Sequence, residues 1–261
     1  MTAVRGLACC GVLAIVSACA PARPALPSGP GAPLPGFEAI YAEAVLECRS
    51  ARTLVAELGL SGRAGDTRLR GRINAGLAAP ADIRLEGVAF GRPVFILAAR
   101  GGDATLLIPR DNRVVRNEPP EAIVEALTGV ALAPADLLAA VAGCGLGAGM
   151  PSNGRTFNDE WAAVDVGEGL TYLRRVNGRW RVGAAVRGRL TVLYADFAGG
   201  LASTVHMRTG AVADITLRVS QLEINTAIDA KAFEVEVPAD AVRLTIDELR
   251  RAGPLGDRSG D

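Results

Sequence analysis

The chain has 261 residues, equal numbers of basic and acidic side chains (28 each), and a hydrophobic content of 49%. So apolar a chain folds around a core rather than staying disordered, and its balanced charge argues against nucleic acid as a partner. Only 4% of residues are aromatic, so we expect a core of Ala, Val, Leu and Ile. The single histidine, His206, excludes a His-rich metal site and a relay of several histidines.

Residues 1–18 have the pattern of a secretory signal peptide. Arg5 precedes an apolar run from Gly6 to Ala18, which is shorter than the roughly 20 residues of a membrane-spanning helix. The run leads into Val16-Ser17-Ala18-Cys19, which resembles a bacterial lipobox. This resemblance implies cleavage before Cys19, lipid on its thiol and acylation of its amino group. The alternative is a plain signal peptide that happens to contain cysteine.

The next segment, residues 19–36, is rich in Pro, Ala and Gly. Such a composition predicts an extended, unpacked tether at about 3.1 Å per residue. Ala20 differs from the aspartate that resembles an inner-membrane retention signal, so the lipobox resemblance favours the outer membrane, on its periplasmic side. We expect one folded domain over 37–253 and a flexible tail over 254–261.

Two cysteines remain if Cys19 carries lipid, namely Cys48 and Cys144. An even number in an oxidising compartment is typical of a disulfide. Buried free thiols are the alternative, because Cys48 falls on an apolar helical stripe. No spacing rule decides between the two.

The sequence of the expected domain predicts a helix, a run of strands, two short helices, more strands and a final helix. Three- and four-residue apolar spacing predicts a helix over Phe37–Glu57, and Pro119-Pro120 and Pro134 open helices over Glu121–Leu127 and Ala135–Ala142. Alternating segments predict strands over Leu58–Arg63, Thr67–Leu77, Ile83–Ala89, Val94–Ala99, Ala104–Pro109, Arg113–Val115 and from Trp161 to Val237.

Finer signals lie in the second half of the chain. Asn177-Gly178 predicts a hairpin with a type I′ turn. The apolar positions change phase between Ser220 and Leu222, which predicts a bulge. A last strand is expected over Phe233–Val237, and Thr245 with Glu248 fits a capping box before a helix over Ile246–Ala252.

This order of elements predicts an α+β fold, with one large curved antiparallel sheet. The sequence lacks the phosphate-binding, nucleophile-elbow and zinc-protease motifs. A lone His206 on a strand is more often structural than catalytic. We therefore expect no enzyme, no cofactor and no metal.

The pattern resembles the LolA/LolB superfamily of bacterial lipoprotein carriers and receptors, and is closest to the LolB-like outer-membrane lipoproteins. The resemblance lies in the order of a first amphipathic helix, strands around Leu58–Ile73, and the stretches Ile83–Gly87, Gly91–Phe95, Pro109–Arg113 and Leu127–Leu138. It implies an incomplete, unclosed barrel with helices covering a concave apolar face. The long segment from Gly145 to Glu160 has no counterpart that we can place in this pattern.

The resemblance also implies candidate site residues. Those expected to line a lipid-binding cavity are Leu85, Phe95, Leu97, Leu107, Leu173, Trp180, Leu190 and Leu217. Phe90 would be the tip of a membrane-insertion loop, or else a buried hairpin residue.

Two functions remain open at this stage. The first is a lipid-anchored protein that binds lipid or lipoprotein acyl chains, with a soluble periplasmic carrier protein as a further partner. The second is a structural or assembly-partner lipoprotein of the cell envelope whose core is filled by side chains. Composition alone does not separate an empty cavity from a filled core.

Replacing Cys19 by alanine tests the anchor. Because the thiol is the expected attachment point of the lipid, Cys19→Ala should move the protein from the membrane to the soluble fraction, measured by ultracentrifugation and immunoblotting. Cys9→Ala, upstream of the expected cleavage point, is the matched control. An unchanged membrane fraction for Cys19→Ala would refute lipidation.

Overall fold

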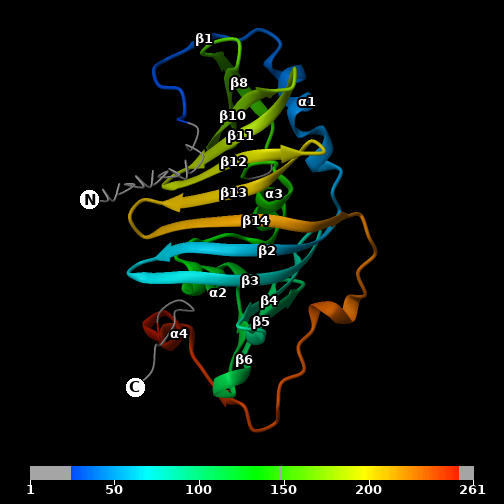
Figure 1. Cartoon of the computed structure of the whole chain (residues 1–261), viewed down its shortest axis with the longest axis vertical. Coiled ribbons are helices and arrows are strands. Elements are labelled where there is room, and N and C mark those ends of the chain that lie inside the picture. Colours follow the sequence, from blue (N-terminus) through cyan, green and yellow to red (C-terminus); the bar gives the residue numbers. More distant parts are fainter. Residues whose placement is uncertain (1–24, 147–148, 253–261) are drawn as a thin grey trace, which may run out of the picture.

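The computed structural model describes residues 25–146 and 149–252, and the predicted signal peptide, Cys19 and tail lie outside these ranges. The described strands form a single sheet in the order β1-β8-β9-β10-β11-β12-β13-β14-β2-β3-β4-β5-β6-β7-β15 (Figure 1). Their bounds are β1 Ala32–Pro33, β2 Thr53–Ala64, β3 Thr67–Ala78, β4 Asp82–Ala89, β5 Arg92–Arg100, β6 Asp103–Ile108, β7 Arg113–Glu118, β8 Pro151–Thr156, β9 Trp161–Val166, β10 Gly169–Val176, β11 Arg179–Arg187, β12 Leu190–Ala198, β13 Leu201–Thr209, β14 Ala213–Ile224 and β15 Val242–Arg243.

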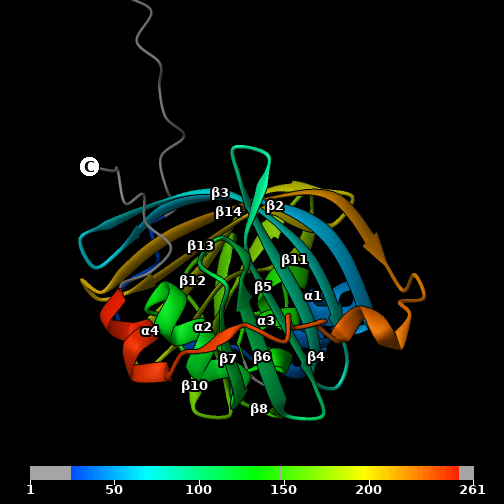
Figure 2. The same ribbon diagram turned by 90° about the horizontal axis from the view of Figure 1, so that it is seen from below.

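The sheet is strongly curved but does not close on itself. Its neighbouring strands are antiparallel except for β15, which runs parallel to β7, and its two edges are β1 and β15. Two helices, α2 and α3, lie inside the curve (Figure 2). The predicted α+β fold with an unclosed barrel is therefore confirmed.

The described residues form helices α1 to α4, and local sequence signals place the ends of all of them except the C-terminal end of α1. Their bounds are α1 Phe37–Arg49, α2 Pro120–Thr128, α3 Pro134–Ala142 and α4 Ile246–Ala252, with 3-10 turns η1 Pro109–Asp111 and η2 Ala230–Phe233. Gly129 and Gly143 cap α2 and α3 in the left-handed conformation. The predicted capping box of α4 is confirmed, because the Thr245 amide donates to the Glu248 carboxylate and the Glu248 amide donates to the Thr245 hydroxyl.

The helix predicted over Phe37–Glu57 is wrong in its second half, because α1 ends at Arg49 and β2 begins at Thr53. The apolar spacing fits both elements at this point. Leu54, Ala56 and Leu58 are buried in alternation, and pairing with β14 and β3 on both sides fixes this segment as a strand.

Two fine signals in the second half are confirmed. Asn177 and Gly178 both have positive φ, and Val176 pairs with Arg179 across the turn. The register between β14 and β2 shifts between Ser220 and Glu223, and Gln221 has a φ of 49°. Before the bulge the apolar residues of β14 stand at odd positions, and after it they stand at even positions. The bulge keeps both groups on the same face of the sheet.

The strand predicted over Phe233–Val237 is wrong, because η2 and an irregular segment occupy these positions. The Arg84 guanidinium on β4 donates to the carbonyls of Ala232 and Glu234. A side chain thus satisfies backbone groups that a strand partner would otherwise satisfy. This segment crosses the outer side of β4 and β5 on its way to β15 (Figure 2).

Part of the expected tether is packed against the domain. Residues 32 and 33 form β1 on β8, the Leu34 amide donates to the Gly154 carbonyl at 3.0 Å, and Leu34 packs on the core. Strand β8 was not predicted, because its Pro, Ser, Asn and Gly residues are typical of loops. Its burial comes from Phe37 of α1, whose ring occupies the space that a side chain at Gly154 would need.

One buried core cluster takes side chains from strands β2 to β7 and β9 to β14. Leu54, Leu77, Leu97, Leu106 and Leu173 are all fully buried, and each fully buried leucine contributes roughly 1.5–3 kcal/mol.

Leu97→Ala should lower the free energy of unfolding by about 2–5 kcal/mol, because it leaves a cavity that the sheet cannot collapse to fill. Leu46→Ala is the matched control, since Leu46 is 70% exposed on α1 and its loss should cost less than about 0.5 kcal/mol. Urea titration followed by circular dichroism gives both values. Equal effects would show that Leu97 is not a core residue in solution.

Candidate functional site

The concave face of the sheet is the candidate site, and most of the residues expected to line it lie there. Seven of the eight belong to the buried core cluster, namely Leu85, Phe95, Leu97, Leu173, Trp180, Leu190 and Leu217. Strand alternation brings them to one face from β4, β5, β10, β11, β12 and β14.

Leu107 is the exception, and its placement corrects the sequence interpretation. Leu106 lies in the core cluster, so the adjacent Leu107 faces the outer side of β6, where it pairs with Ile96 of β5. It is nevertheless buried. Because β6 is apolar on both faces, its sequence does not reveal which leucine points inward.

Phe95 illustrates how closely this face is packed. Its ring covers Gly87 on the neighbouring strand, in the space where a side chain at position 87 would stand. A glycine inside a strand commonly marks such a close approach. The pair closes the base of the β4–β5 hairpin.

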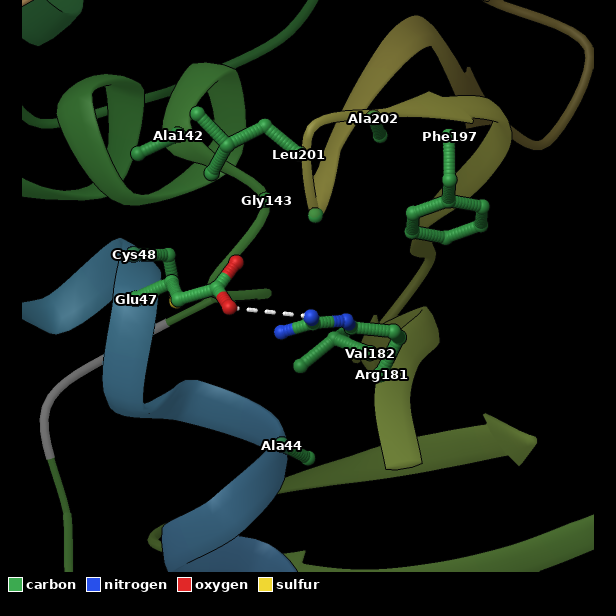
Figure 3. Close-up of a pocket in the computed structure, with 11 residues that line it drawn as sticks. Ala44, Glu47, Cys48, Ala142, Gly143, Arg181, Val182, Phe197, Leu201 and Ala202 are labelled. Carbon is green, nitrogen blue, oxygen red and sulfur yellow. Dashed lines mark hydrogen bonds and ion pairs between the residues drawn. The ribbon is translucent and has the colours of Figure 1, made fainter. Parts of the chain in front are cut away.

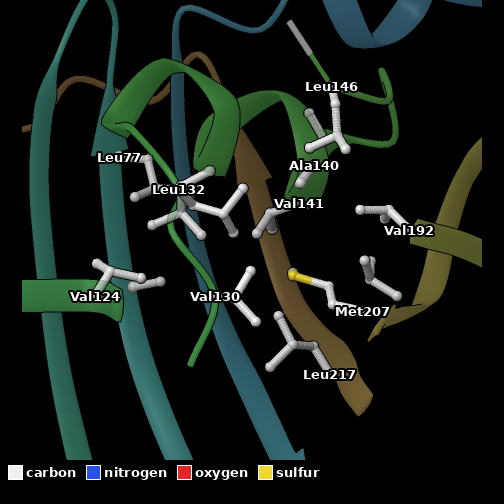
Figure 4. Packing of buried hydrophobic residues seen from close by; sticks show 14 of the residues in the cluster. Leu77, Val124, Val130, Leu132, Ala140, Val141, Leu146, Val192, Met207 and Leu217 are labelled. Carbon is white, nitrogen blue, oxygen red and sulfur yellow. The ribbon is translucent and has the colours of Figure 1, made fainter. Parts of the chain in front are cut away.

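In the described conformation the concave face is filled by side chains. Helices α2 and α3 and the segment between them place Val124, Val130, Leu132 and Val141 against Leu77, Met207 and Leu217 of the sheet (Figure 4). Leu97 and Leu173 are 0% exposed, so neither borders a void that admits a water molecule. In this conformation the concave face therefore encloses a packed core rather than an empty cavity.

Helix α3 is fixed to the sheet and to α1 by three strong interactions. Cys144, two residues beyond α3, forms a disulfide with Cys48 of α1, with a Cα–Cα distance of 5.5 Å. The Arg187 guanidinium on β11 donates two hydrogen bonds to the Asp136 carboxylate in the first turn of α3. These bonds raise the pKa of Arg187 above its ordinary value.

Tyr194 provides the third. Its hydroxyl, fully buried on β12, accepts a hydrogen bond from the Gly145 amide at 3.1 Å. Burial raises the pKa of this hydroxyl well above its ordinary value, so it stays neutral. Sequence reasoning missed Tyr194, although its inward position in the Leu190, Val192, Tyr194 alternation is the signal that would have found it.

Helix α2 is held differently. It buries Ile123, Val124 and Leu127, and it packs on α4 and β6. The ion pair that links it to α4, between Arg250 and Glu125, spans 3.6 Å with both side chains about half exposed. Such exposed pairs contribute little, about 0–1 kcal/mol. Apolar contacts therefore dominate the attachment of α2.

A small hollow lies beside the disulfide, between α1, the end of α3 and strands β11–β13 (Figure 3). Its enclosed volume is about 10 Å³, which is room for about one water molecule. Glu47 and Arg181 form an ion pair across it at 2.9 Å. This hollow is far too small for a lipid tail.

Polar chemistry is sparse in the part of the chain that the structure describes. It contains no cluster of three or more His, Cys, Asp or Glu residues positioned for a metal ion. The His206 Nε2 atom lies 2.7 Å from a carboxylate oxygen of Asp214, in a pair on the outer side of β13 and β14. Within residues 25–146 and 149–252, no helix is long and apolar enough to cross a membrane.

Phe90 lies at the turn of the β4–β5 hairpin with 93% of its surface exposed. Its φ is 51°, and Gly91 after it has a φ of 74°. The alternative of a buried hairpin residue is therefore wrong for this conformation. The hairpin projects beyond the body of the sheet (Figure 2).

Comparison with solved structures identifies the class of fold. A LolA superfamily protein from Nitrosomonas europaea superposes with a TM-score of 0.53 at 14% identity, over 76% of this chain and 96% of that chain. The chain thus has a LolA/LolB-like fold.

Further solved structures match with lower scores. A putative outer membrane lipoprotein-sorting protein domain from Vibrio parahaemolyticus gives a TM-score of 0.46 at 13% identity, over 74% of this chain and 95% of that chain. The Mycobacterium tuberculosis lipoprotein LppX gives 0.34 at 12% identity, over 75% and 99%. No family model and no curated protein matches the sequence.

Removing the disulfide should destabilise the whole domain, because it closes a loop with a sequence separation of 96 residues. The double variant Cys48→Ala, Cys144→Ala should lose about 2–5 kcal/mol of unfolding free energy, measured by urea titration. Wild-type protein kept in reductant is the matched control and should show the same loss. An unchanged midpoint in both would mean that the bridge does not form in solution.

Proposed function

We propose that this protein is a lipid-anchored component of the bacterial cell envelope that receives lipid, or the acyl chains of lipoproteins, on its concave face. Cys19 would hold it to the outer membrane on the periplasmic side. Its role would lie in lipoprotein localisation to that membrane or in assembly of the membrane, with a soluble periplasmic carrier as donor. The activity is binding and transfer, without covalent chemistry.

The observation that carries this proposal is the unequal attachment of the two helices over the concave face. A disulfide, a double hydrogen bond and a buried tyrosine fix α3. Apolar contacts and an exposed ion pair hold α2. Displacement of α2 would uncover an aliphatic surface while α3 stays in place, which is how a lid works.

The energies permit such an exchange. Withdrawing Ile123, Val124 and Leu127 from the core costs about 5–9 kcal/mol, at roughly 1.5–3 kcal/mol for each side chain. An acyl chain gains about 0.8 kcal/mol per buried methylene, so a chain of about ten methylenes offsets the loss. Long acyl chains would therefore bind and short ones would not.

The Phe90 hairpin supplies a contact with the bilayer. The Phe90 ring is 93% exposed, and transfer of such an apolar ring from water into the acyl region of a bilayer is favourable. The absence of acidic residues between positions 87 and 93 favours the same use.

A second candidate is a structural or assembly-partner lipoprotein with no ligand. The filled concave face favours it, since Leu97 and Leu173 border no void. The two candidates differ in one respect, namely whether α2 leaves the sheet.

Leu127→Ala, in α2, should strengthen uptake of a fluorescent hexadecanoyl probe. Truncating a buried leucine weakens the closed state by about 2–5 kcal/mol, and a less stable closed state lowers the apparent Kd by at least tenfold. Titration of the probe, with an octanoyl probe for comparison, measures the effect.

Leu137→Ala, in α3, is the matched control. It removes the same buried side chain from a nine-residue helix that is clamped in place, so it should leave the apparent Kd unchanged. Mass spectrometry of wild-type protein purified without detergent provides an independent measurement. No copurified lipid, together with no probe uptake by any variant, would refute lipid binding and leave the structural candidate.

A further inference from the structure

The convex face, which lies opposite α2 and α3, carries exposed arginines on four adjacent strands. We call this group the arginine face, and its members are Arg63 on β2, Arg68, Arg70 and Arg72 on β3, Arg208 on β13 and Arg218 on β14. On β3 they alternate with Leu69, which belongs to the core cluster, so they point away from it. The chain as a whole has equal numbers of basic and acidic residues, so its positive charge is unevenly distributed and is concentrated on this face.

The strand register brings these side chains together. Arg63 stands directly opposite Arg68, and Gly59 separates Arg72 on one side from Arg218 on the other. Like charges in directly opposed positions destabilise a sheet. The core does not require these side chains, and an anionic partner would neutralise their charge.

Acidic side chains offset this charge only in part. Glu57 pairs with Arg72 at 2.9 Å, and 59% of the Arg72 side chain stays exposed. Asp214 is engaged by His206 on the same face. Glu223, which also points outward from these strands, lies beyond the bulge of β14. On these four strands six outward arginines therefore outnumber three outward carboxylates, and Asp66 in the turn between β2 and β3 adds a fourth acidic side chain.

The β4–β5 hairpin rises beside this face and on the same side of the molecule (Figure 2). Val88 of the hairpin pairs with Arg72 of the arginine face. Arg92, exposed on the second strand, adds a further positive charge next to Phe90. An exposed apolar tip thus projects from a basic surface.

We propose that the arginine face and the Phe90 hairpin form one docking surface for a bilayer rich in anionic phospholipid. Phe90 enters the acyl region, and the guanidinium groups bind headgroup phosphates, for which their planar donors are suited. Each arginine close to an anionic surface strengthens attachment by about fivefold. This inference rests on the proposed function, which already places Phe90 in the membrane.

Docking in this way orients the molecule. With the convex face on the bilayer, α2 and α3 lie on the side turned away from it (Figure 2). A soluble carrier would then reach the concave face without competing with the membrane for it.

The test places a reporter at the hairpin tip of the full chain reconstituted into vesicles. Trp161 and Trp180 are each 8% exposed, so their emission serves as the baseline, and Phe90→Trp adds the reporter. In phosphatidylglycerol vesicles with brominated acyl chains, the added emission should be blue-shifted and at least half quenched. In phosphatidylcholine vesicles with the same brominated chains, or in 1 M salt, where the Debye length is about 3 Å, the quenching should fall at least fivefold.

Charge reversal separates this proposal from the hairpin insertion on which it rests. Arg68→Glu with Arg70→Glu, in the Phe90→Trp background, should reduce quenching in anionic vesicles to the value found in neutral ones. Arg110→Glu with Arg116→Glu is the matched control, because both arginines are exposed and lie on η1 and β7, away from the arginine face. It should leave quenching unchanged.

Each contrary outcome overturns a different part. Equal quenching in anionic and neutral vesicles, unaffected by either pair, would overturn the arginine face and keep hairpin insertion. No quenching in any vesicle would overturn insertion itself. Loss of quenching on addition of soluble polyphosphate, at constant ionic strength and with vesicles still present in excess, would assign the arginines to a soluble polyanion.

Discussion

The rest of the structure depends on the packing of α2 and α3 into the curve of the sheet. A single curved layer with an aliphatic inner face is not stable in water by itself, because that face must be buried. Here two nine-residue helices and the segment between them bury it. The same side chains that complete the core therefore occupy the space in which a ligand would lie. Under the proposed function, stability and ligand binding would compete for this one surface.

The interactions that hold α3 in place bear on this competition. The disulfide, the Arg187–Asp136 hydrogen bonds and the Tyr194–Gly145 hydrogen bond all act on one helix or on the residues just after it. Under the proposed function, they would keep α3 in place while α2 is displaced. The outer face shows a complementary division, since its arginines gather on β2, β3, β13 and β14 while an irregular segment bound by Arg84 covers β4 and β5.

Much of the fold could be predicted from the sequence, because its local signals are strong. Asn177-Gly178, the phase change after Ser220 and the capping box at Thr245 each depend on a few adjacent residues. The errors lie where distant residues decide. Thr53 to Glu57 is a strand because of its partners β14 and β3, and Phe233–Val237 is irregular because Arg84 binds its carbonyls. Leu107 faces outward in a strand that is apolar on both sides, so the sequence has no alternation of apolar and polar residues that would indicate its inner face. Of the interactions that hold α3, the Cys48–Cys144 disulfide was one of two alternatives that the sequence left open. The hydrogen bond between Tyr194 and Gly145 was not predicted, since these residues are 49 positions apart.

The position of β2 in the middle of the sheet also governs the order in which the domain can form. β2, at Thr53–Ala64, follows directly after α1, yet its neighbour on one side is β14, at Ala213–Ile224 near the end of the chain. Until β14 has been made, the twelve-residue β2 presents an open row of backbone donors and acceptors. In a partly synthesised chain this unpaired edge of β2 can therefore pair with strands of other molecules. The sheet is complete only when almost the whole polypeptide has been synthesised. This topology therefore favours folding after synthesis is complete over stepwise folding during synthesis.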